Sequence, residues 1–216
     1  MQIILASSSL RRRQLLSYLI DKFTVISSHV NEKALSKLAR LPEELVVKLA
    51  KAKAKEVGKR LAICDRDREK LMIGSDLIVV LERENNWQAL SKPKDINQAR
   101  EMLKKLRGKS HKVFTGICVL NTKTKQLIID FDISEISFKE FPDEVMEEYL
   151  ATGKSLDRAG AYGIQDLDER YIQEIKGSYT NIIGLPLSKL ARILKAFKVE
   201  VKPNWQKDVK HNLGAI

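Results

Sequence analysis

The stretch MIGSDLIVVLE, residues 72–82, decides the fold, because it has the apolar character of a buried strand with an aspartate in its middle. Patterns typical of helices lie between this run and the other apolar runs of the chain, so the sequence predicts an α/β fold. The other strand-like runs are residues 3–6, 23–28, 112–121 and 126–138.

Helical patterns are expected at residues 9–20, 42–61, 95–107, 142–152 and 186–198. Pro42, Pro142 and Pro186 stand near the beginnings of three of them, where a first turn accepts proline. The polar run NTKTKQ, residues 121–126, lies between two strand patterns and predicts a hairpin. The sheet is therefore expected to be mixed rather than wholly parallel.

The chain has 216 residues, of which 44% are hydrophobic, enough for one α/β domain or two small lobes. We expect the domain to occupy residues 1–198 and a polar, loosely ordered tail to follow at residues 199–216. The absence of an apolar run long enough to span a membrane favours a cytoplasmic protein. Cys64 and Cys118 are far apart in the sequence, so neither a disulfide framework nor a zinc site is expected.

Thirty-nine basic residues against 28 acidic residues give a formal net charge of +11. This charge is compatible with nucleic acid, an acidic membrane surface or a small polyanion. The lysines are scattered and seldom alternate with aromatic residues, a pattern more typical of solvated helix faces than of a surface on which bases stack. Nucleic-acid binding without catalysis stays open as an alternative function.

Asp76 interrupts the central strand, and burying an unpaired carboxylate there would cost several kcal/mol. It therefore needs a cation, which a metal ion, a lysine or an arginine would each supply. A structural ion pair would also explain it. Glu32 follows the second strand in a loop-like stretch, and two carboxylates at strand ends are able to hold a hard divalent ion.

The stretch LASSSLRRRQLL, residues 5–16, predicts a strand, a tight turn and the start of a helix. Free amides and the helix dipole favour an anion there, and arginine adds bidentate phosphate contacts. The serines and arginines of this stretch, residues 7–9 and 11–13, are thus candidates for binding a phosphate. The alternative is a serine cap followed by a solvated basic turn.

Lys53 shares the stripe of Leu45, Leu49 and Val57 on the second predicted helix. It faces inward, and the spacing alone favours a stem that runs along the core with its ammonium in solvent. Lys92 precedes a proline, which stiffens the backbone and aims its side chain.

His111 is either a base or a structural histidine, and the sequence around it favours the structural role. Gln165 ends the turn AGAYGIQ, and its amide is able to read the edge of a base or to orient a water.

Eight ordered pieces of the chain together resemble the Maf family of nucleoside triphosphate pyrophosphatases. The pieces are SSSLRRRQLL, NE, LAKAKA, GSDLIVV, LSKP, GKSHKVFTG, DRAGAYGIQ and GSYTNIIGLPL. The resemblance implies metal-dependent hydrolysis of a nucleoside triphosphate to the monophosphate and pyrophosphate, in a cytoplasmic and commonly homodimeric enzyme. The implied fold is an elongated mixed sheet flanked by helices, in two lobes with a central cleft, similar to inosine triphosphate pyrophosphatases.

Carried over by position, the family's catalytic and substrate-binding residues fall on residues already singled out above. They are Ser7, Arg11, Arg12, Glu32, Lys53, Asp76, Lys92 and Gln165. On this resemblance Glu32 and Asp76 hold Mg²⁺ or Mn²⁺, and either acid is able to serve as the base.

The base preference also follows from the resemblance. Arg11, Arg12, His111 and Gln165 resemble the branch that acts on dTTP and UTP, and a glutamine amide suits the imide edge of these pyrimidines. A branch that acts on modified purines such as 7-methyl-GTP is the alternative. The chain departs from the usual family pattern at Leu10, Leu77 and Ser91.

Overall fold

The computed structural model describes residues 1–36, 39–62, 69–83 and 86–213. In this part of the chain seven strands form one sheet in the order β2-β1-β3-β5-β6-β7, with β4 paired to β3. The strands are β1 (Gln2–Leu5), β2 (Thr24–Val25), β3 (Lys70–Arg83), β4 (Asn86–Leu90), β5 (Ser110–Asn121), β6 (Leu127–Phe138) and β7 (Ile172–Lys176).

The sheet is mixed, as the hairpin pattern predicts. Strand β1 runs parallel to β2 and β3, whereas β3 pairs antiparallel with β4 and β5, and β6 pairs antiparallel with β5 and β7. The predicted hairpin joins β5 to β6, and the Asn121 amide donates to the Gln126 carbonyl at 2.9 Å. The α/β fold and its mixed sheet are thereby confirmed.

The five predicted helices are present within two residues of their expected ends. The helices are α1 (Leu10–Leu19), α2 (Glu32–Ser36), α3 (Pro42–Ala62), α4 (Ile96–Leu106), α5 (Asp143–Ala151), α6 (Tyr179–Ile183), α7 (Leu187–Ala196) and α8 (Trp205–Leu213). Pro42 begins α3, while Pro142 and Pro186 stand one residue before α5 and α7. The sequence pattern missed α2, α6 and α8, of which the first two are only five residues long.

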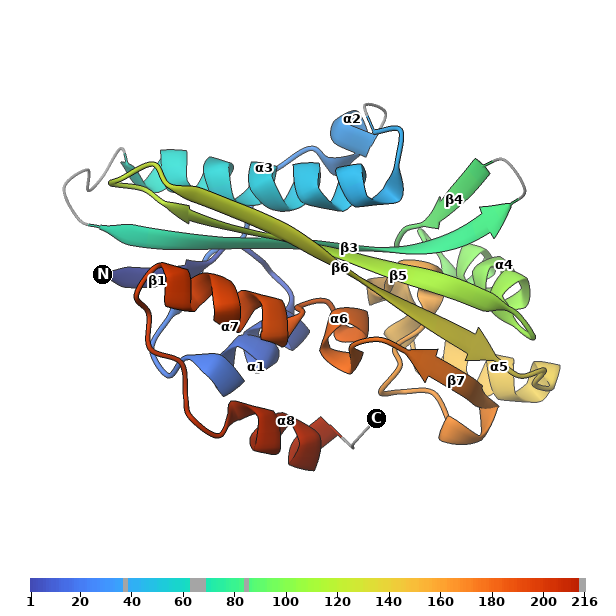
Figure 1. The fold of residues 1–216 in the computed structure, drawn as a ribbon. Helices are drawn as coiled ribbons and strands as arrows, with labels where there is room; N and C mark the ends of the chain where they lie inside the picture. The colour runs from blue at the N-terminus through green and yellow to red at the C-terminus, as the bar shows by residue number, and fades with distance from the viewer. Residues whose placement is uncertain (37–38, 63–68, 84–85, 214–216) are drawn as a thin grey trace.

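The long strands β3, β5 and β6 run through the whole molecule and join its two ends (Figure 1). One end carries β1, α1, α7 and α8, and the other carries β4, α4, α5 and β7. Helix α3 covers one face of the sheet, and α1, α6 and α7 cover the opposite face. This arrangement corresponds to the expected elongated sheet with two lobes.

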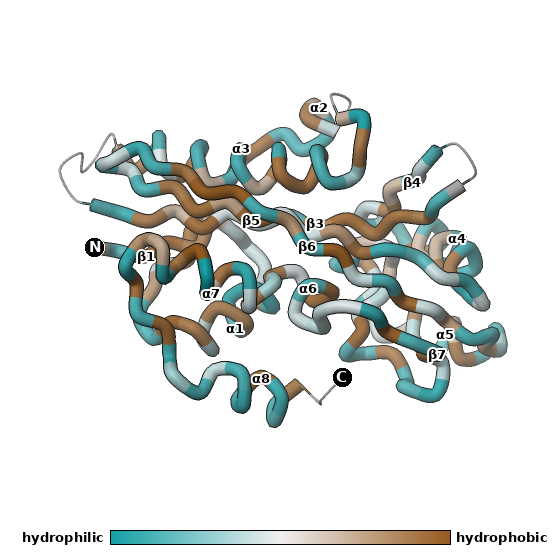
Figure 2. Tube along the Cα trace, in the orientation of Figure 1, coloured by the Kyte–Doolittle hydropathy of each residue, from teal (hydrophilic) through white to brown (hydrophobic). Residues whose placement is uncertain are grey.

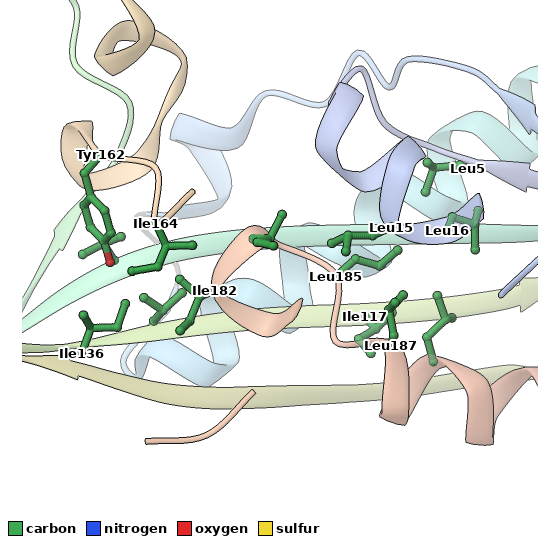
Figure 3. Packing of buried hydrophobic residues seen from close by; sticks show 14 of the residues in the cluster. Leu5, Leu15, Leu16, Ile117, Ile136, Tyr162, Ile164, Ile182, Leu185 and Leu187 are labelled. Atoms are coloured by element: carbon green, nitrogen blue, oxygen red, sulfur yellow. The ribbon is translucent and has the colours of Figure 1, made fainter. Parts of the chain in front are cut away.

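The core has one layer on each face of the sheet. In Figure 2 the hydrophobic residues follow the strands and the inner sides of the helices. The larger layer includes Leu16 from α1, Ile117 from β5 and Leu187 from α7, each fully buried (Figure 3). Burying such an aliphatic side chain stabilises the fold by roughly 1.5–3 kcal/mol. The smaller layer lies under α3.

The C-terminal segment differs from its expectation. We predicted a loosely ordered tail, but residues 205–213 form α8, whose residues Trp205, Val209 and Leu213 pack against the main core. The prediction was wrong because three apolar residues at a spacing of four, in an otherwise polar segment, are enough to dock one helix face. Residues 214–216 lie outside the described part of the chain, as does Cys64.

Within the described residues no helix is both long enough and apolar enough to cross a lipid bilayer. Cys118 is buried in the sheet, and burial raises the pKa of its thiol to about 12. A cysteine with that pKa remains protonated and unreactive at neutral pH.

Candidate active site

A cavity of about 580 Å³ lies between the two ends of the molecule. Its wall combines the turn from β1 to α1, parts of α2, α3 and β3, the segment after β4, and the loop that follows α5. All eight residues predicted from the sequence line this cavity. Residues from both lobes therefore surround one space, as the resemblance implied.

Lys53 lies at the centre of the charged part of the cavity. Its Nζ is 2.5 Å from Oδ1 of Asp76 and 2.7 Å from Oε1 of Glu32. The side chains of Lys53 and Asp76 are only 10% and 9% exposed, whereas that of Glu32 is 56% exposed. Lys53 is thus the cation that pairs with Asp76. The sequence alone leaves a metal ion, a lysine and an arginine as possible partners.

The expectation that the Lys53 ammonium would reach solvent was wrong. Its stripe on α3 is buried as predicted, with Leu45 and Leu49 each 3% exposed. The ammonium stays inside because two carboxylates replace its water, which favours an inward lysine over one that reaches the surface. Spacing along a helix cannot reveal this partner, since Asp76 comes from the sheet.

Burial raises the pKa of Asp76, and the positive charges of Lys53 and Arg12 oppose that rise only in part. A carboxylate in such surroundings is more basic than one on the surface. Asp76 is therefore able to accept a proton from a group inside the cavity.

The turn from β1 to α1 places an arginine and three serines in the cavity wall. Ser9 caps α1, and its Oγ accepts from the Arg12 amide at 3.4 Å. The Arg12 guanidinium then folds back, with Nε donating to the Gly184 carbonyl at 2.9 Å and Nη1 to Ser7 Oγ at 3.4 Å. The serine cap of the alternative interpretation is present, and Arg12 lines the cavity rather than pointing into solvent; phosphate binding at this turn stays a prediction.

Arg11 and Lys92 enter the cavity from opposite lobes and share one partner. Nη1 of Arg11 is 3.3 Å from Oδ2 of Asp157, and Nζ of Lys92 is 2.5 Å from Oδ1 of the same carboxylate. Burial alone would raise the pKa of Asp157, but Lys92 and Arg11 hold it below its usual value. The sequence analysis did not single out Asp157.

The loop after α5 supplies three further polar side chains to the cavity wall, those of Arg158, Tyr162 and Gln165. Gln165 was predicted, whereas Arg158 and Tyr162 were not. Arg158 pairs with Asp166, with 2.5 Å between Nη2 and Oδ2. A partly buried charge partner this close fixes the guanidinium in place at the cavity wall.

His111 has the structural role that its surroundings in the sequence favoured. It is 2% exposed, and its Nε2 is 2.7 Å from the hydroxyl of Tyr162. Burial lowers the pKa of His111 to about 4. A histidine with that pKa is neutral at physiological pH and holds Tyr162 in the cavity wall as a neutral hydrogen-bond partner.

The three departures from the family pattern differ in their placement. Leu77 and Ser91 line the cavity, while Leu10 begins α1 and is 71% exposed. No group of three or more His, Cys, Asp or Glu side chains able to hold a metal ion occurs among the described residues.

Comparison with known proteins finds relatives that match about nine-tenths of the chain. The chain is 39% identical over 197 residues to a dTTP/UTP pyrophosphatase of Clostridioides difficile (strain 630), covering 91% of this chain and 95% of that protein. It is 41% identical over 194 residues to a protein of the same name from Alkaliphilus oremlandii (strain OhILAs), covering 90% and 95%. A third, from Thermoanaerobacter sp. (strain X514), is 42% identical over 195 residues, covering 90% and 96%.

The family model of Maf-like proteins matches residues 2–197, which include every residue of the cavity described above. The match spans most of the chain and confirms the resemblance drawn from the eight short motifs. The chain therefore belongs to the Maf family.

Proposed function

We propose that this protein hydrolyses nucleoside triphosphates to the monophosphate and pyrophosphate, with dTTP and UTP as its preferred substrates. One observation carries the proposal: cations from both lobes converge in one cavity with a buried carboxylate, Asp76, and an exposed one, Glu32. Among the cations that line it are Arg11, Arg12, Lys53 and Lys92, together with the carboxylates of Asp76 and Glu32. The relatives' printed activity, dTTP/UTP pyrophosphatase, supports the same conclusion.

A triphosphate is the ligand that this charge pattern fits, because its negative charge is clustered at one end. Arg11 and Lys92 come from different lobes but contact the same Asp157 carboxylate, so they lie close enough for one anionic group to contact both. Catalysis of phosphate transfer depends mostly on positioning and charge neutralisation. Arg12 and the N-terminal end of α1 add a positive field at the same wall.

The proposed reaction uses the carboxylates for proton transfer and the cations for the leaving group. A water attacks the α-phosphorus, the bond from that phosphorus to the bridging oxygen breaks, and pyrophosphate leaves with the electron pair. The water's proton passes to an Oδ atom of Asp76. Lys53 holds Asp76 and Glu32 together, while Arg11 and Lys92 neutralise the charge that grows on the leaving pyrophosphate.

A divalent cation, Mg²⁺ or Mn²⁺, is part of this proposal. Glu32 and Asp76 offer only oxygen ligands, as hard cations prefer, and Lys53 contacts one oxygen of each. Glu32 and Asp76 are the residues that would hold the ion. When bound, the ion would lower the pKa of the attacking water and neutralise phosphate charge.

The pyrimidine preference rests on the loop after α5. Gln165 offers both a donor and an acceptor from the cavity wall, which matches the carbonyl and imide groups of uracil or thymine. A site built on such hydrogen bonds rejects a wrong base edge by several orders of magnitude, since its own polar groups would stay unpaired. Leu77 is apolar where the family's pyrimidine branch usually has threonine.

The test is a measurement of pyrophosphate released from dTTP, UTP, 7-methyl-GTP and the other common nucleoside triphosphates, with Mg²⁺ or Mn²⁺. We expect the highest kcat/KM for dTTP and UTP. Asp76→Asn should lower the rate by at least about two orders of magnitude, the scale of losing a general base or a preorganised charge. Asp130→Asn, a change of the same kind on β6 outside the cavity wall, is the control.

Each other outcome would change a different part of the proposal. A clear preference for 7-methyl-GTP would overturn the pyrimidine assignment and leave the hydrolysis in place. Near-normal turnover by a folded Asp76→Asn variant would remove Asp76 from the mechanism. Absence of pyrophosphate release, together with strongly salt-dependent binding of nucleic acid, would favour the nucleic-acid-binding alternative.

A homodimer in the cytoplasm is likewise part of the proposal and rests on the family resemblance alone. Analytical ultracentrifugation of the purified chain tests the dimer. A sedimentation mass equal to that of one chain at micromolar concentration would contradict it.

A further inference from the structure

One exposed carboxylate, that of Asp157, pairs with two of the cations that line the cavity. Asp157 belongs to a short 3-10 helix, Lys154–Asp157, that follows α5. Its two carboxylate oxygens bind different cations, Oδ1 the Lys92 ammonium at 2.5 Å and Oδ2 the Arg11 guanidinium at 3.3 Å. Both cations line the cavity, and they come from opposite lobes.

The Asp157 carboxylate contacts Arg11 and Lys92 in the way that a phosphate group would. A phosphate group also presents separate oxygens to separate cations, and arginine and lysine are its usual partners. The Asp157 carboxylate carries one negative charge, whereas a triphosphate carries several. The Asp157 side chain is 67% exposed, so it is able to turn into solvent when a stronger anion arrives.

We propose that Asp157 competes with the substrate's phosphates for Arg11 and Lys92 and thereby sets the affinity of the site for polyphosphate. The inference rests on the proposed function, because it concerns the same cations. Asp157 weakens the binding of the triphosphate and of the pyrophosphate product by the same factor. It therefore raises KM and also helps the product to leave.

The competition differs from a purely structural role because a second contact holds the same segment. Nη2 of Arg11 donates to the backbone carbonyl of Asp157 at 3.0 Å, and this bond does not need the carboxylate. Asp157→Asn thus removes the competing charge and leaves Arg11 attached to the loop. If Asp157 only positioned the two cations, the same change would weaken anion binding instead.

Asp130 provides a matched control. Its carboxylate also bridges one lysine and one arginine, with Oδ1 3.3 Å from Lys189 Nζ and Oδ2 2.8 Å from Arg192 Nη2. Neither Lys189 nor Arg192 belongs to the wall of the cavity. Asp130→Asn changes the net charge by the same amount as Asp157→Asn without freeing a cavity cation.

The experiment measures binding of inorganic triphosphate by titration calorimetry to the wild type, Asp157→Asn and Asp130→Asn. In the ligand-free wild type, triphosphate must displace Asp157 from its two ion pairs with Arg11 and Lys92. Asp157→Asn lacks these two ion pairs, so we expect it to bind triphosphate between about 2-fold and 10-fold more tightly. Asp130→Asn should bind as the wild type does. When Lys92 is also replaced by methionine, the ratio of triphosphate affinities with and without Asp157→Asn should fall toward 1.

Unchanged or weaker binding by Asp157→Asn, with an unfolding temperature equal to that of the wild type, would overturn the proposal. So would an equal gain in Asp130→Asn, because net charge alone would then explain it. The inorganic probe requires no catalysis. A failure of nucleotide hydrolysis would therefore refute the proposed function and leave this test valid.

Discussion

Replacing Lys53 by methionine tests the ion pairs of Lys53 with Glu32 and Asp76 through the free energy of unfolding alone. The change removes the ammonium from between Glu32 and Asp76 and keeps an unbranched stem in the core. Asp76, whose side chain is 9% exposed, then loses its closest cation. Removing one partner of a buried ion pair costs about 3–5 kcal/mol, because the remaining charge is left uncompensated. Arg12 still lowers the pKa of Asp76, so we expect the lower end of this range, about 3 kcal/mol.

The double variant Lys53→Met/Asp76→Asn separates the lost charge from lost packing. An amide carries no charge, and replacing both members of a buried ion pair often changes the free energy of unfolding very little. We therefore expect the double variant to recover about 2 kcal/mol relative to Lys53→Met alone. The assay is urea-induced unfolding followed by circular dichroism at pH 7, with a chelator and without nucleotide. A loss below about 1 kcal/mol in Lys53→Met, or no recovery in the double variant, would refute the reasoning.

Two further changes test other parts of the fold. Because burial lowers the pKa of His111 to about 4, the unfolded chain binds more protons than the folded chain between that value and the ordinary pKa of about 6.5. The stability that neutral His111 contributes is complete above pH 6.5 and falls by roughly 3 kcal/mol as the pH drops to 4. His111→Gln should lose that part of the acid sensitivity in urea unfolding from pH 7 to 4.5, and an unchanged pH dependence would contradict this. Gly116→Ala would place a Cβ 2.3 Å from the Val46 carbonyl oxygen, so we expect a loss of about 3 kcal/mol in the same assay. Gly58→Ala, whose Cβ meets the flexible Met72 side chain at 3.3 Å, is its control and should change stability by less than about 1 kcal/mol.

The sequence predicted those features that depend on local pattern. Runs or spacings of hydrophobic residues predict the strands β1, β3, β5 and β6 and the helices α1, α3, α4, α5 and α7. Asp76 and Lys53 were recognised because each interrupts an apolar pattern, and a charge at such a position needs a partner. Their pairing with each other joins residues 23 positions apart, and local pattern does not contain it.

The residues that the sequence did not reveal depend on contacts between distant segments. Asp157 meets Arg11 across 146 positions and Lys92 across 65, and although it begins the motif DRAGAYGIQ, local pattern does not reveal these two partners. Arg158 and Tyr162 lie within the motif DRAGAYGIQ, which was used only to recognise the family. Strand β7 was missed because its burial alternates only weakly at the edge of the sheet.

Two glycines under α3 allow the close helix packing on which the charged part of the cavity depends. Added Cβ atoms at Gly74 and Gly116 would lie 2.1 Å from the Ala50 carbonyl oxygen and 2.3 Å from that of Val46, so only glycine lets α3 approach the sheet this closely. Gly116 pairs directly with Asp76, and Gly74 lies two residues before Asp76 on the same face of β3. The Asp76 carboxylate consequently faces α3 one helical turn beyond Ala50, where Lys53 stands. A side chain at either glycine would move α3 away and separate the lysine from both carboxylates, so the close helix packing is itself a condition for the charged centre of the cavity.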